Sequence, residues 1–358
     1  MTAPTMTGAA PQPFSLAGRP IGPGHPPFIV AEMSGNHNGD LGRALALIDA
    51  AKAAGADAVK LQTYTADTIT IDHDGPGFLI EEGLWKGRRL YELYQEAFTP
   101  WDWHERMFRH AADIGIVVFS TPFDPTAVAL LEQLNAPAYK IASFELIDLP
   151  LIELAAAAGK PLIMSTGLAS PAEIGEAVGA ARKAGARDIV LLHCVSGYPT
   201  PPGEMNLATM GELARTWGVL VGLSDHTMSN AVSIAAVALG ACVIEKHFTL
   251  KRADGGPDAA FSLEADELAG LVRDCRTAWE ALGTVRYDET PSEGAARDHR
   301  RSLYVVADIA EGETVTPANV RSIRPGLGLP PKHLPQVLGK TAARALKRGA
   351  PLAWDMLR

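Results

Sequence analysis

The chain has 358 residues, of which 47% are hydrophobic and 20% are charged, as in a typical soluble globular protein. Its formal net charge of −9 argues against a broadly basic surface and therefore against non-specific binding to nucleic acid. An anionic substrate remains possible, because a local group of lysines can oppose the overall sign. Three cysteines without a C-x-x-C pair indicate a reducing, cytoplasmic environment, and no apolar run is long enough to span a membrane.

Residues 1–14 are expected to form a disordered tail, because they lack the charged segment and the long apolar core of a signal peptide. From residue 27 onwards, short apolar runs alternate with amphipathic segments of a dozen or more residues. Eight runs are apolar on both alternating faces, which is typical of parallel strands buried on both sides. These runs are 27–34, 58–63, 116–123, 138–143, 161–167, 189–194, 221–226 and 242–248.

The segments between these strands carry helix signals. Asp40 can cap a helix with an apolar face, and Ser170 with Glu173 forms a capping-box pattern before another helix. Eight strand–helix units over about 250 residues match the size of a closed (β/α)8 TIM barrel, which we assign to residues 15–283. A doubly wound open sheet is the less favoured alternative, because no G-x-G-x-x-G turn follows the first strand.

Three further segments interrupt or follow this alternation. The longest insertion, residues 64–98, follows the second strand and is therefore expected on the active-site side of a barrel. Residues 284–296 are polar and contain Pro and Gly, which predicts a linker. Residues 297–358 have short apolar runs and many turn residues, which predicts a small β-rich domain.

Polar side chains gather where the predicted strands end, and in a parallel barrel these ends share one face. Lys60 and Lys140 lie within apolar strands, where a buried ammonium group costs several kcal/mol unless an anion neutralises it. Glutamates or a phosphate or carboxylate ligand could serve as that anion. Serines at neighbouring strand ends would complete an anion-binding group.

His226 and His247 end two neighbouring predicted strands. Their ring nitrogens can converge on one ion, with Glu32 or Glu245 as an oxygen ligand. Such a site suits Mn²⁺, Fe²⁺, Co²⁺ or Zn²⁺ and can accept Mg²⁺. The alternative is that each histidine is a hydrogen-bonded part of the structure. His104, on a predicted helix, is expected at the surface.

The motifs AEMSGNHNG, AVKLQTYTADT, FSTPFD, YKIASFE, MSTG, LLHCVSGYPTP, GLSDHT and EKHFTL occur in this order along the chain. Together they resemble the sialic acid synthase family, whose members are (β/α)8 barrels followed by a small antifreeze-like (SAF) domain. The segment RRSLYVVADIAEGE and the later RPGLG resemble that second domain. The resemblance covers the chain from about residue 15 to its end.

This resemblance implies an enzyme that condenses phosphoenolpyruvate with an open-chain N-acyl amino sugar and releases phosphate. The stretches KLQTYTADT and GLWKGRRLYELY are similar to the pseudaminic acid synthase branch, whose sugar is 2,4-diacetamido-2,4,6-trideoxy-L-altrose. Legionaminic acid and N-acetylneuraminic acid synthases, which share this chemistry, are the alternatives. No nucleic-acid or membrane partner is expected.

The resemblance also implies roles for individual residues. It implies His226 and His247 as ligands of a divalent metal ion, with Mn²⁺ expected and Mg²⁺ or Co²⁺ as alternatives. Ser196 stands where neuraminate synthases carry an asparagine, which puts that contact in question. The implied catalytic residues are Glu32, Lys60 and Lys140, and the implied phosphoenolpyruvate ligands are Lys60, Lys140, Ser143, Ser165, Ser196 and Ser224. The implied sugar-binding residues are Gln62, Glu145, Tyr198 and Asp258, with Arg324 reaching the site from the second domain across a domain-swapped homodimer.

Two other classes of function remain open. Lys140 could form an imine with pyruvate in a Schiff-base aldolase. The chain could also be a non-catalytic carbohydrate-binding protein with the C-terminal domain as its binding module. The density of charged residues at the strand ends argues against a protein that only binds sugar.

Overall fold

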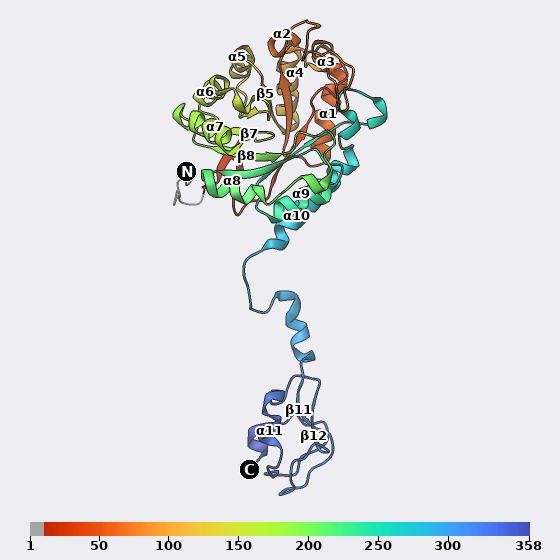
Figure 1. The fold of residues 1–358 in the computed structure, drawn as a ribbon. Helices are drawn as coiled ribbons and strands as arrows, with labels where there is room; N and C mark the ends of the chain where they lie inside the picture. The colour runs from red at the N-terminus through yellow and green to blue at the C-terminus, as the bar shows by residue number, and fades with distance from the viewer. Residues whose placement is uncertain (1–10) are drawn as a thin grey trace. The chain divides into compact units, whose positions relative to one another are not determined.

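The computed structural model describes residues 11–358, apart from the side chain of residue 295, and divides after Gly283 into two units (Figure 1). Most of the expected N-terminal tail, residues 1–10, lies outside the described residues. Among the helices that are described, none has the length and apolar character needed to cross a membrane.

Eight parallel strands close into a barrel within the described part of the first unit. Strands pair in chain order, and the last strand pairs with the first, which confirms the predicted (β/α)8 barrel. Each strand lies within a predicted apolar run or within one residue of it. The strands are β3 (Phe28–Glu32), β4 (Ala58–Thr63), β5 (Val117–Pro122), β6 (Tyr139–Ile141), β7 (Leu162–Ser165), β8 (Ile189–Cys194), β9 (Leu220–Asp225) and β10 (Val243–His247).

Helices between the strands surround the barrel (Figure 1). The Asp40 side chain accepts a hydrogen bond from the backbone N–H of Arg43, and Ser170 with Glu173 forms the expected capping box. The helices pack apolar residues against the outer face of the strands. They are α1 (Leu41–Ala53), α4 (Trp101–Ile114), α5 (Pro125–Gln133), α6 (Leu149–Ala157), α7 (Pro171–Lys183), α8 (Thr209–Trp217), α9 (Asn230–Ala238) and α10 (Ala265–Leu282).

A hairpin that the sequence pattern did not predict precedes the barrel. Strands β1 (Phe14–Leu16) and β2 (Arg19–Ile21) pair in antiparallel fashion, so Phe14 lies in a strand and the assignment of that residue to a disordered tail was wrong. The two turn residues, Ala17 and Gly18, both have positive φ, as a two-residue hairpin turn requires. Alanine is unusual at such a position, so the sequence pattern did not indicate a turn here.

The hairpin closes one end of the barrel. Leu16 and Ile21 are fully buried and pack with apolar side chains that fill the barrel interior, among them Phe28, Phe119 and Leu192. This filled layer leaves the opposite end, where the strands terminate, for the polar side chains.

The insertion after β4 forms two short helices and a hairpin-like arch. Helix α2 (Ala66–Ile69) comes first and α3 (Leu90–Ala97) comes last. Between them, Ile80 and Arg88 are joined by a backbone hydrogen bond of 2.9 Å, and Phe78 and Leu90 by another of 2.9 Å. We call residues 78–90 the arch.

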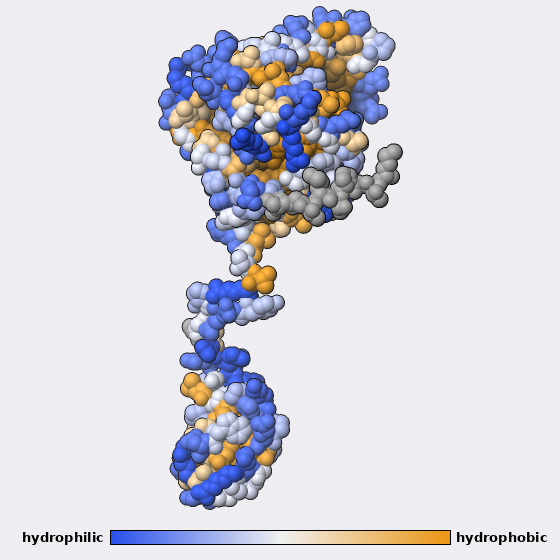
Figure 2. Space-filling view, turned by 90° about the vertical axis from the view of Figure 1, so that its left-hand side faces the viewer, coloured by the Kyte–Doolittle hydropathy of each residue, from blue (hydrophilic) through white to orange (hydrophobic). Residues whose placement is uncertain are grey.

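The second unit is a small β-rich domain, as the sequence predicted. Strands β11 (Ser302–Val305) and β12 (Val320–Ile323) pair in antiparallel fashion over a core that includes Leu303, Val320 and Val337. The other elements of this unit are η5 (Pro291–His299), η6 (Pro331–His333), α11 (Leu334–Val337) and η7 (Trp354–Met356). The 3-10 helix η5 overlaps the segment predicted as a linker. On the face drawn in Figure 2 the surface of this unit is mostly hydrophilic.

Candidate active site

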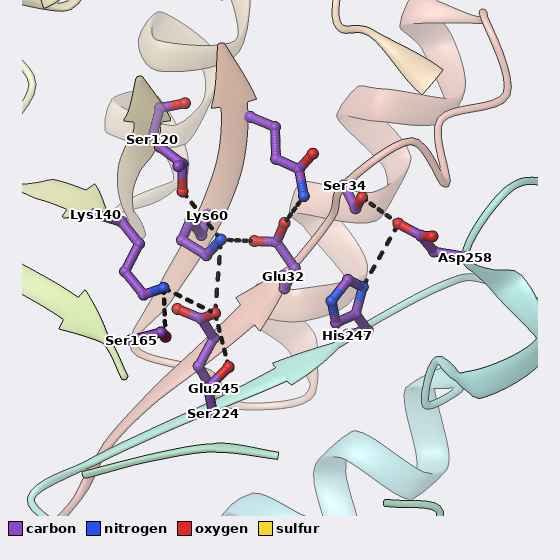
Figure 3. A network of polar contacts seen from close by, with 12 residues as sticks. Glu32, Ser34, Lys60, Ser120, Lys140, Ser165, Ser224, Glu245, His247 and Asp258 are labelled. Atoms are coloured by element: carbon purple, nitrogen blue, oxygen red, sulfur yellow. Dashed lines mark hydrogen bonds and ion pairs between the residues drawn. The ribbon is translucent and has the colours of Figure 1, made fainter. Parts of the chain in front are cut away.

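Four charged side chains on β3, β4, β6 and β10 lie together inside the barrel, and we call Glu32, Lys60, Lys140 and Glu245 the inner cluster (Figure 3). The Lys60 ammonium lies 2.7 Å from Oε2 of Glu32 and 3.6 Å from Oε1 of Glu245. The Lys140 ammonium lies 3.7 Å from that same Glu245 oxygen. All four side chains are buried. Two cations therefore share one carboxylate in a site with little water.

Alternation along β10 decides which residues enter this cluster. Glu245 and His247 point into the barrel, whereas Lys246 between them points toward the helices and lies 2.9 Å from Asp225 Oδ2. We call Asp225 and Lys246 the outer pair. Glu245, one of the two carboxylates expected as a possible metal ligand, lies between the two lysines instead.

The two lysines differ in how well their charges are balanced. Burial opposes the charge of Lys60, but Glu245 and Glu32 outweigh this effect and raise its pKa. Burial lowers the pKa of Lys140, and Glu245 offsets that effect only in part. Burial also raises the pKa of Glu32 to about 7, despite the nearby Lys60. An anion bound beside Lys140 would therefore stabilise its ammonium form.

The serines expected to bind an anion lie at Lys140, at Glu245 and at the wall of the adjoining cavity. Its ammonium donates a 2.7 Å hydrogen bond to Ser165, and Ser224 donates to Glu245 Oε1 over 3.3 Å. Ser143 and Ser196 form a hydrogen-bonded pair of 2.9 Å at the wall of the adjoining cavity. Two of the predicted serines, Ser165 and Ser224, therefore contact the inner cluster, and the other two pair with each other at the cavity wall.

Gly167 of the MSTG motif allows this close arrangement. Its φ is +45°, and a β-carbon at this position would lie 2.3 Å from Cβ of Ser143 and 3.0 Å from Oγ of Ser196. Any larger side chain would push the loop away from the two serines.

The two predicted metal ligands lie side by side at the ends of β9 and β10. The ring centroids of His226 and His247 are 5.4 Å apart. Nδ1 of His226 lies 2.9 Å from the carbonyl oxygen of Val195, so it donates that hydrogen bond and leaves the lone pair of Nε2 available. Burial lowers the pKa of His226 to about 4, and burial likewise lowers the pKa of His247. Both rings are therefore neutral near pH 7, as metal ligation requires.

The rings of His226 and His247 can supply two of the ligands of a divalent metal ion. Nδ1 of His247 is buried and makes no hydrogen bond within the described chain, and it lies 3.8 Å from Asp258 Oδ2. The His226 ring is oriented by its hydrogen bond to the Val195 carbonyl. Metal-binding histidines are commonly oriented by such a hydrogen bond from the ring nitrogen that does not bind the metal. Across residues 11–358, no group of three or more His, Cys, Asp or Glu side chains is arranged to hold a metal ion.

A cavity of about 530 Å³ opens beside the histidines, and four predicted sugar-binding residues line it: Gln62, Glu145, Tyr198 and Asp258. Burial raises the pKa of Glu145 to about 7 and that of Asp258 to about 6, although Ser34 donates a hydrogen bond to Asp258. The Tyr198 ring lies 4.4 Å from the ring of His226, centroid to centroid. The cavity thus holds two carboxyl groups that can be protonated near neutral pH.

The predicted sugar contact of Arg324 is untested, and the predicted surface position of His104 is wrong. Arg324 is exposed in the second unit, just after β12, so its contact with the sugar stays a prediction. His104 was expected at the surface, but it is buried, and its Nε2 lies 2.9 Å from the Thr63 hydroxyl. Burial lowers its pKa to about 4. This histidine supports β4 from α4 and has no place in the cavity.

Comparison with known proteins identifies the family. A family model described as the NeuB family matches residues 47–287, and a SAF domain model matches residues 300–358. The chain belongs to the NeuB family. This NeuB-family chain is 44% identical to a pseudaminic acid synthase of Helicobacter pylori over 331 residues, which cover 92% of this chain and 97% of that protein. An N,N'-diacetyllegionaminic acid synthase of Campylobacter jejuni is 37% identical, covering 89% and 97%.

Solved structures agree with the family assignment. The crystal structure of N-acetylneuraminic acid synthetase from Leptospira borgpetersenii matches 80% of this chain and 95% of its own, with a TM-score of 0.71 and 33% sequence identity. The NeuB-family chain is therefore a nonulosonate synthase, an enzyme of the transferase class.

Proposed function

We propose that the enzyme condenses phosphoenolpyruvate with 2,4-diacetamido-2,4,6-trideoxy-L-altrose to give pseudaminic acid and phosphate, and that it needs a divalent metal ion. The observation that carries this proposal is the pair of buried lysines that share Glu245 beside two neutral histidines. The choice of sugar rests on the higher identity to the Helicobacter pylori pseudaminic acid synthase than to the legionaminic acid synthase. Synthesis of legionaminic or N-acetylneuraminic acid is the alternative.

Lys60 and Lys140 would hold phosphoenolpyruvate, together with the serines around them. The substrate is strongly anionic, and Lys140 has an incompletely balanced charge in a buried site. A charge-assisted hydrogen bond to the substrate would be strong there, because little water competes for the ammonium group. Holding both substrates in one cavity would also remove much of the entropic barrier to their reaction.

His226 and His247 would hold the metal ion, with Mn²⁺ expected and Mg²⁺ or Co²⁺ as alternatives. When bound, the ion would supply Lewis-acid polarisation of the sugar aldehyde. The hydrogen bond from His226 to the Val195 carbonyl keeps one ring nitrogen protonated and the other free to bind.

Glu32 is suited to the proton transfers of the reaction. A carbon–carbon bond forms between the enol carbon and the aldehyde carbon, water adds to the former enol centre, and the resulting intermediate expels phosphate. The hydroxyl group that water leaves on that carbon gives its proton to the departing phosphate, and the added water passes its other proton to the aldehyde oxygen, so the protons balance. With a pKa of about 7, and with Gln62 and Lys60 holding its two oxygens, Glu32 can accept that proton and pass it on.

One observation favours a Schiff-base aldolase as a second candidate. Burial lowers the pKa of Lys140, which would help its amine to attack a carbonyl group. Borohydride reduction in the presence of pyruvate would attach the substrate to Lys140 in that case. Under the synthase proposal, mass spectrometry finds no such adduct.

The test of the synthase proposal is a phosphate-release assay with phosphoenolpyruvate and each of the three candidate sugars, followed by mass spectrometry of the product. We expect turnover of the trideoxy altrose sugar, loss of turnover with a chelator, and recovery with Mn²⁺. His226→Ala and His247→Ala should abolish activity and metal binding. His110→Ala is the control, since that ring pairs with Asp49 on the barrel surface. Full activity in metal-free enzyme contradicts the metal requirement, and turnover of another sugar alone contradicts the substrate.

We also propose a homodimer in which Arg324 of one copy completes the site of the other. Mixing an inactive Lys140→Met enzyme with an inactive Arg324→Ala enzyme should then restore part of the activity, because one site in a mixed dimer has both residues. Size-exclusion chromatography with light scattering measures the oligomeric state. A monomer, or a mixture that stays inactive, contradicts the shared site.

A further inference from the structure

Three consecutive residues of the motif AEMSGNHNG have no part in the proposed function, although two of them are polar and buried. Ser34, Gly35 and Asn36 follow β3, and Ser34 and Asn36 are 3% and 0% exposed. The backbone of Ser34 has a φ of +47°, a left-handed conformation that few residues other than glycine and asparagine adopt. A serine held in this conformation indicates that its side chain has a specific task.

The two polar residues of this loop both hold Asp258, which lies in the segment after β10. The Ser34 hydroxyl donates a hydrogen bond to Oδ2 of Asp258. The Asn36 amide donates a 2.9 Å hydrogen bond to the Ser262 hydroxyl, which in turn donates one of 2.7 Å to the backbone carbonyl of Asp258. Both the side chain and the backbone of Asp258 are therefore fixed from the loop after β3.

The residue before Asp258 is held as well. A β-carbon on Gly35 would lie 2.7 Å from Cγ of Pro257, so the close packing of these two residues depends on glycine. From the other side, the indole N–H of Trp85 in the arch donates a 2.8 Å hydrogen bond to the carbonyl oxygen of Pro257. Together, these contacts fix the place of the Asp258 carboxyl group.

That place is beside His247. Figure 3 shows one oxygen of Asp258 between the Ser34 hydroxyl and the His247 ring. This oxygen lies 3.8 Å from Nδ1 of His247, a nitrogen that is buried and makes no hydrogen bond within the described chain. Since 3.8 Å is longer than a hydrogen bond, a movement of about 1 Å would give this nitrogen a partner.

The other predicted metal ligand has such a partner in place. Nδ1 of His226 donates a 2.9 Å hydrogen bond to the carbonyl of Val195. A carbonyl or carboxylate oxygen in this position fixes the tautomer and the orientation of a metal-binding histidine. Asp258 lies at Nδ1 of His247 as Val195 lies at Nδ1 of His226.

We propose that Ser34 is a positioning residue that holds the Asp258 carboxylate at Nδ1 of His247, so that this ring binds the metal ion through Nε2. The inference rests on the proposed function, in which His226 and His247 hold the ion. It gives Asp258 a task at the histidine besides its predicted sugar contact. Loss of an outer-sphere partner of this kind typically lowers metal affinity about 10- to 100-fold.

The first test is calorimetric titration of Mn²⁺ into metal-free enzyme without either substrate, so that a contact between Ser34 and the sugar cannot affect the result. Ser34→Ala and Ser34→Gly both remove the hydroxyl group, but only glycine also relieves the backbone strain. We expect both variants to bind Mn²⁺ about tenfold more weakly, and Asp258→Ala about 10- to 100-fold more weakly.

Ser233→Ala is the matched control. The Ser233 hydroxyl is also buried and donates a 2.6 Å hydrogen bond to an aspartate, Asp225 of the outer pair. Asp225 keeps Lys246 and the Thr227 N–H as partners in this variant. We expect its Mn²⁺ affinity to equal that of wild type.

The second test reads the position of the proton directly. Nitrogen-15 NMR of histidine-labelled, metal-free enzyme at pH 8 distinguishes a protonated from an unprotonated ring nitrogen, and His247→Gln assigns the signals of that ring. We expect the proton on Nδ1 of both His226 and His247 in wild type. In Asp258→Ala, His247 should become a mixture of tautomers, whereas His226 should stay unchanged.

The inference is overturned by a proton on Nε2 of His247 in wild-type enzyme, or by unchanged Mn²⁺ affinity in Ser34→Ala and Ser34→Gly. Weaker binding in Ser34→Ala alone would assign the effect to backbone strain, and equal weakening by Ser233→Ala would assign it to the loss of any buried hydroxyl group. Absence of Mn²⁺ binding by wild-type enzyme is a separate result, which contradicts the proposed metal requirement and this inference with it.

Discussion

The outer pair and the inner cluster are both sets of buried charges on the barrel strands, yet their polar atoms are paired very differently. In the outer pair, Lys246 lies 2.9 Å from Asp225 and also donates to the carbonyl of Thr227. Asp225 accepts further hydrogen bonds from the Thr227 N–H at 2.8 Å and from the Ser233 hydroxyl at 2.6 Å. Each carboxylate oxygen of Asp225 therefore has at least one donor.

In the inner cluster, by contrast, not every carboxylate oxygen has a donor. One oxygen of Glu245 lies 3.6 Å from Lys60 and 3.7 Å from Lys140, and its other oxygen has no hydrogen-bond partner within the described chain. Buried polar groups are normally satisfied, so a group left unsatisfied calls for a reason. The outer pair is thus fully paired within the protein, as a structural ion pair is, whereas the inner cluster leaves a buried oxygen unpaired and two lysines on one carboxylate, which is consistent with the proposed anionic substrate.

The largest expected effect is on Lys140. Lys140→Met keeps the length of the side chain and removes its charge, so we predict a loss of about 10³-fold in kcat/KM for phosphoenolpyruvate. Because Lys60 still pairs with Glu245, the free energy of unfolding should fall less than in the outer-pair variant below. Steady-state kinetics and urea unfolding measure the two quantities. Near-normal activity of Lys140→Met would contradict the proposal that the inner cluster binds substrate while the outer pair is structural.

The matching change in the outer pair should affect stability instead. Lys246→Met leaves Asp225 buried without its cation, and we predict a loss of about 3–5 kcal/mol in the free energy of unfolding. Urea unfolding at pH 7.5 measures this loss. The variant that also carries Asp225→Leu should recover much of the stability. A stable Lys246→Met protein would show that the outer pair is not structural.

A smaller effect is expected where the serines approach Gly167. Gly167→Ala should lower kcat/KM for phosphoenolpyruvate about 10²-fold, because the new methyl group displaces Ser143. Gly218→Ala is the control: its φ of +59° imposes similar backbone strain, but a β-carbon there meets nothing within 4 Å. Equal kinetics for the two variants would mean that strain, and not the position of the serines, explains the loss.

The smallest effect concerns Glu145, whose pKa burial raises from 4.5 to about 7. Since the folded protein favours the protonated form, the stability from this group is complete below pH 4.5 and is lost as the pH rises through about 7. Glu145→Gln should therefore be more stable than wild type at pH 8, by about 2 kcal/mol after allowance for partial exposure. This difference should shrink toward pH 4.5. If thermal unfolding curves show the same stability difference between Glu145→Gln and wild type at every pH, the raised pKa is contradicted.

The sequence predicted the barrel well because its strands are buried on both faces. Such strands are continuous apolar runs, and the run 58–63 coincides with β4 while the run 189–194 coincides with β8. The N-terminal hairpin was missed because its turn uses Ala17 in place of the usual Asn or Gly. His104 was misplaced because one polar residue in a helix does not reveal that a buried threonine on β4 faces it.

The candidate site was predictable as a set of residues but not as a network. Strand ends in a parallel barrel share one face, so Lys60, Lys140, His226 and His247 could be grouped from their positions alone. Glu245 lies between the lysines because successive side chains along β10 point in opposite directions. The consecutive residues Glu245, Lys246 and His247 follow this alternation, so this part of the network could be read from the sequence. The Trp85 contact with Pro257 joins residues distant in sequence, and no local pattern encodes it.

The central claim, that the inner cluster is a site for an anionic substrate, is tested most directly by calorimetric titration of phosphoenolpyruvate into the enzyme without sugar. The account predicts saturable binding by wild type, loss of that binding in Lys140→Met, and its retention in Lys246→Met at a temperature where that variant is folded. Equal binding by wild type and Lys140→Met, or no binding by wild type with Mn²⁺ present, would contradict it.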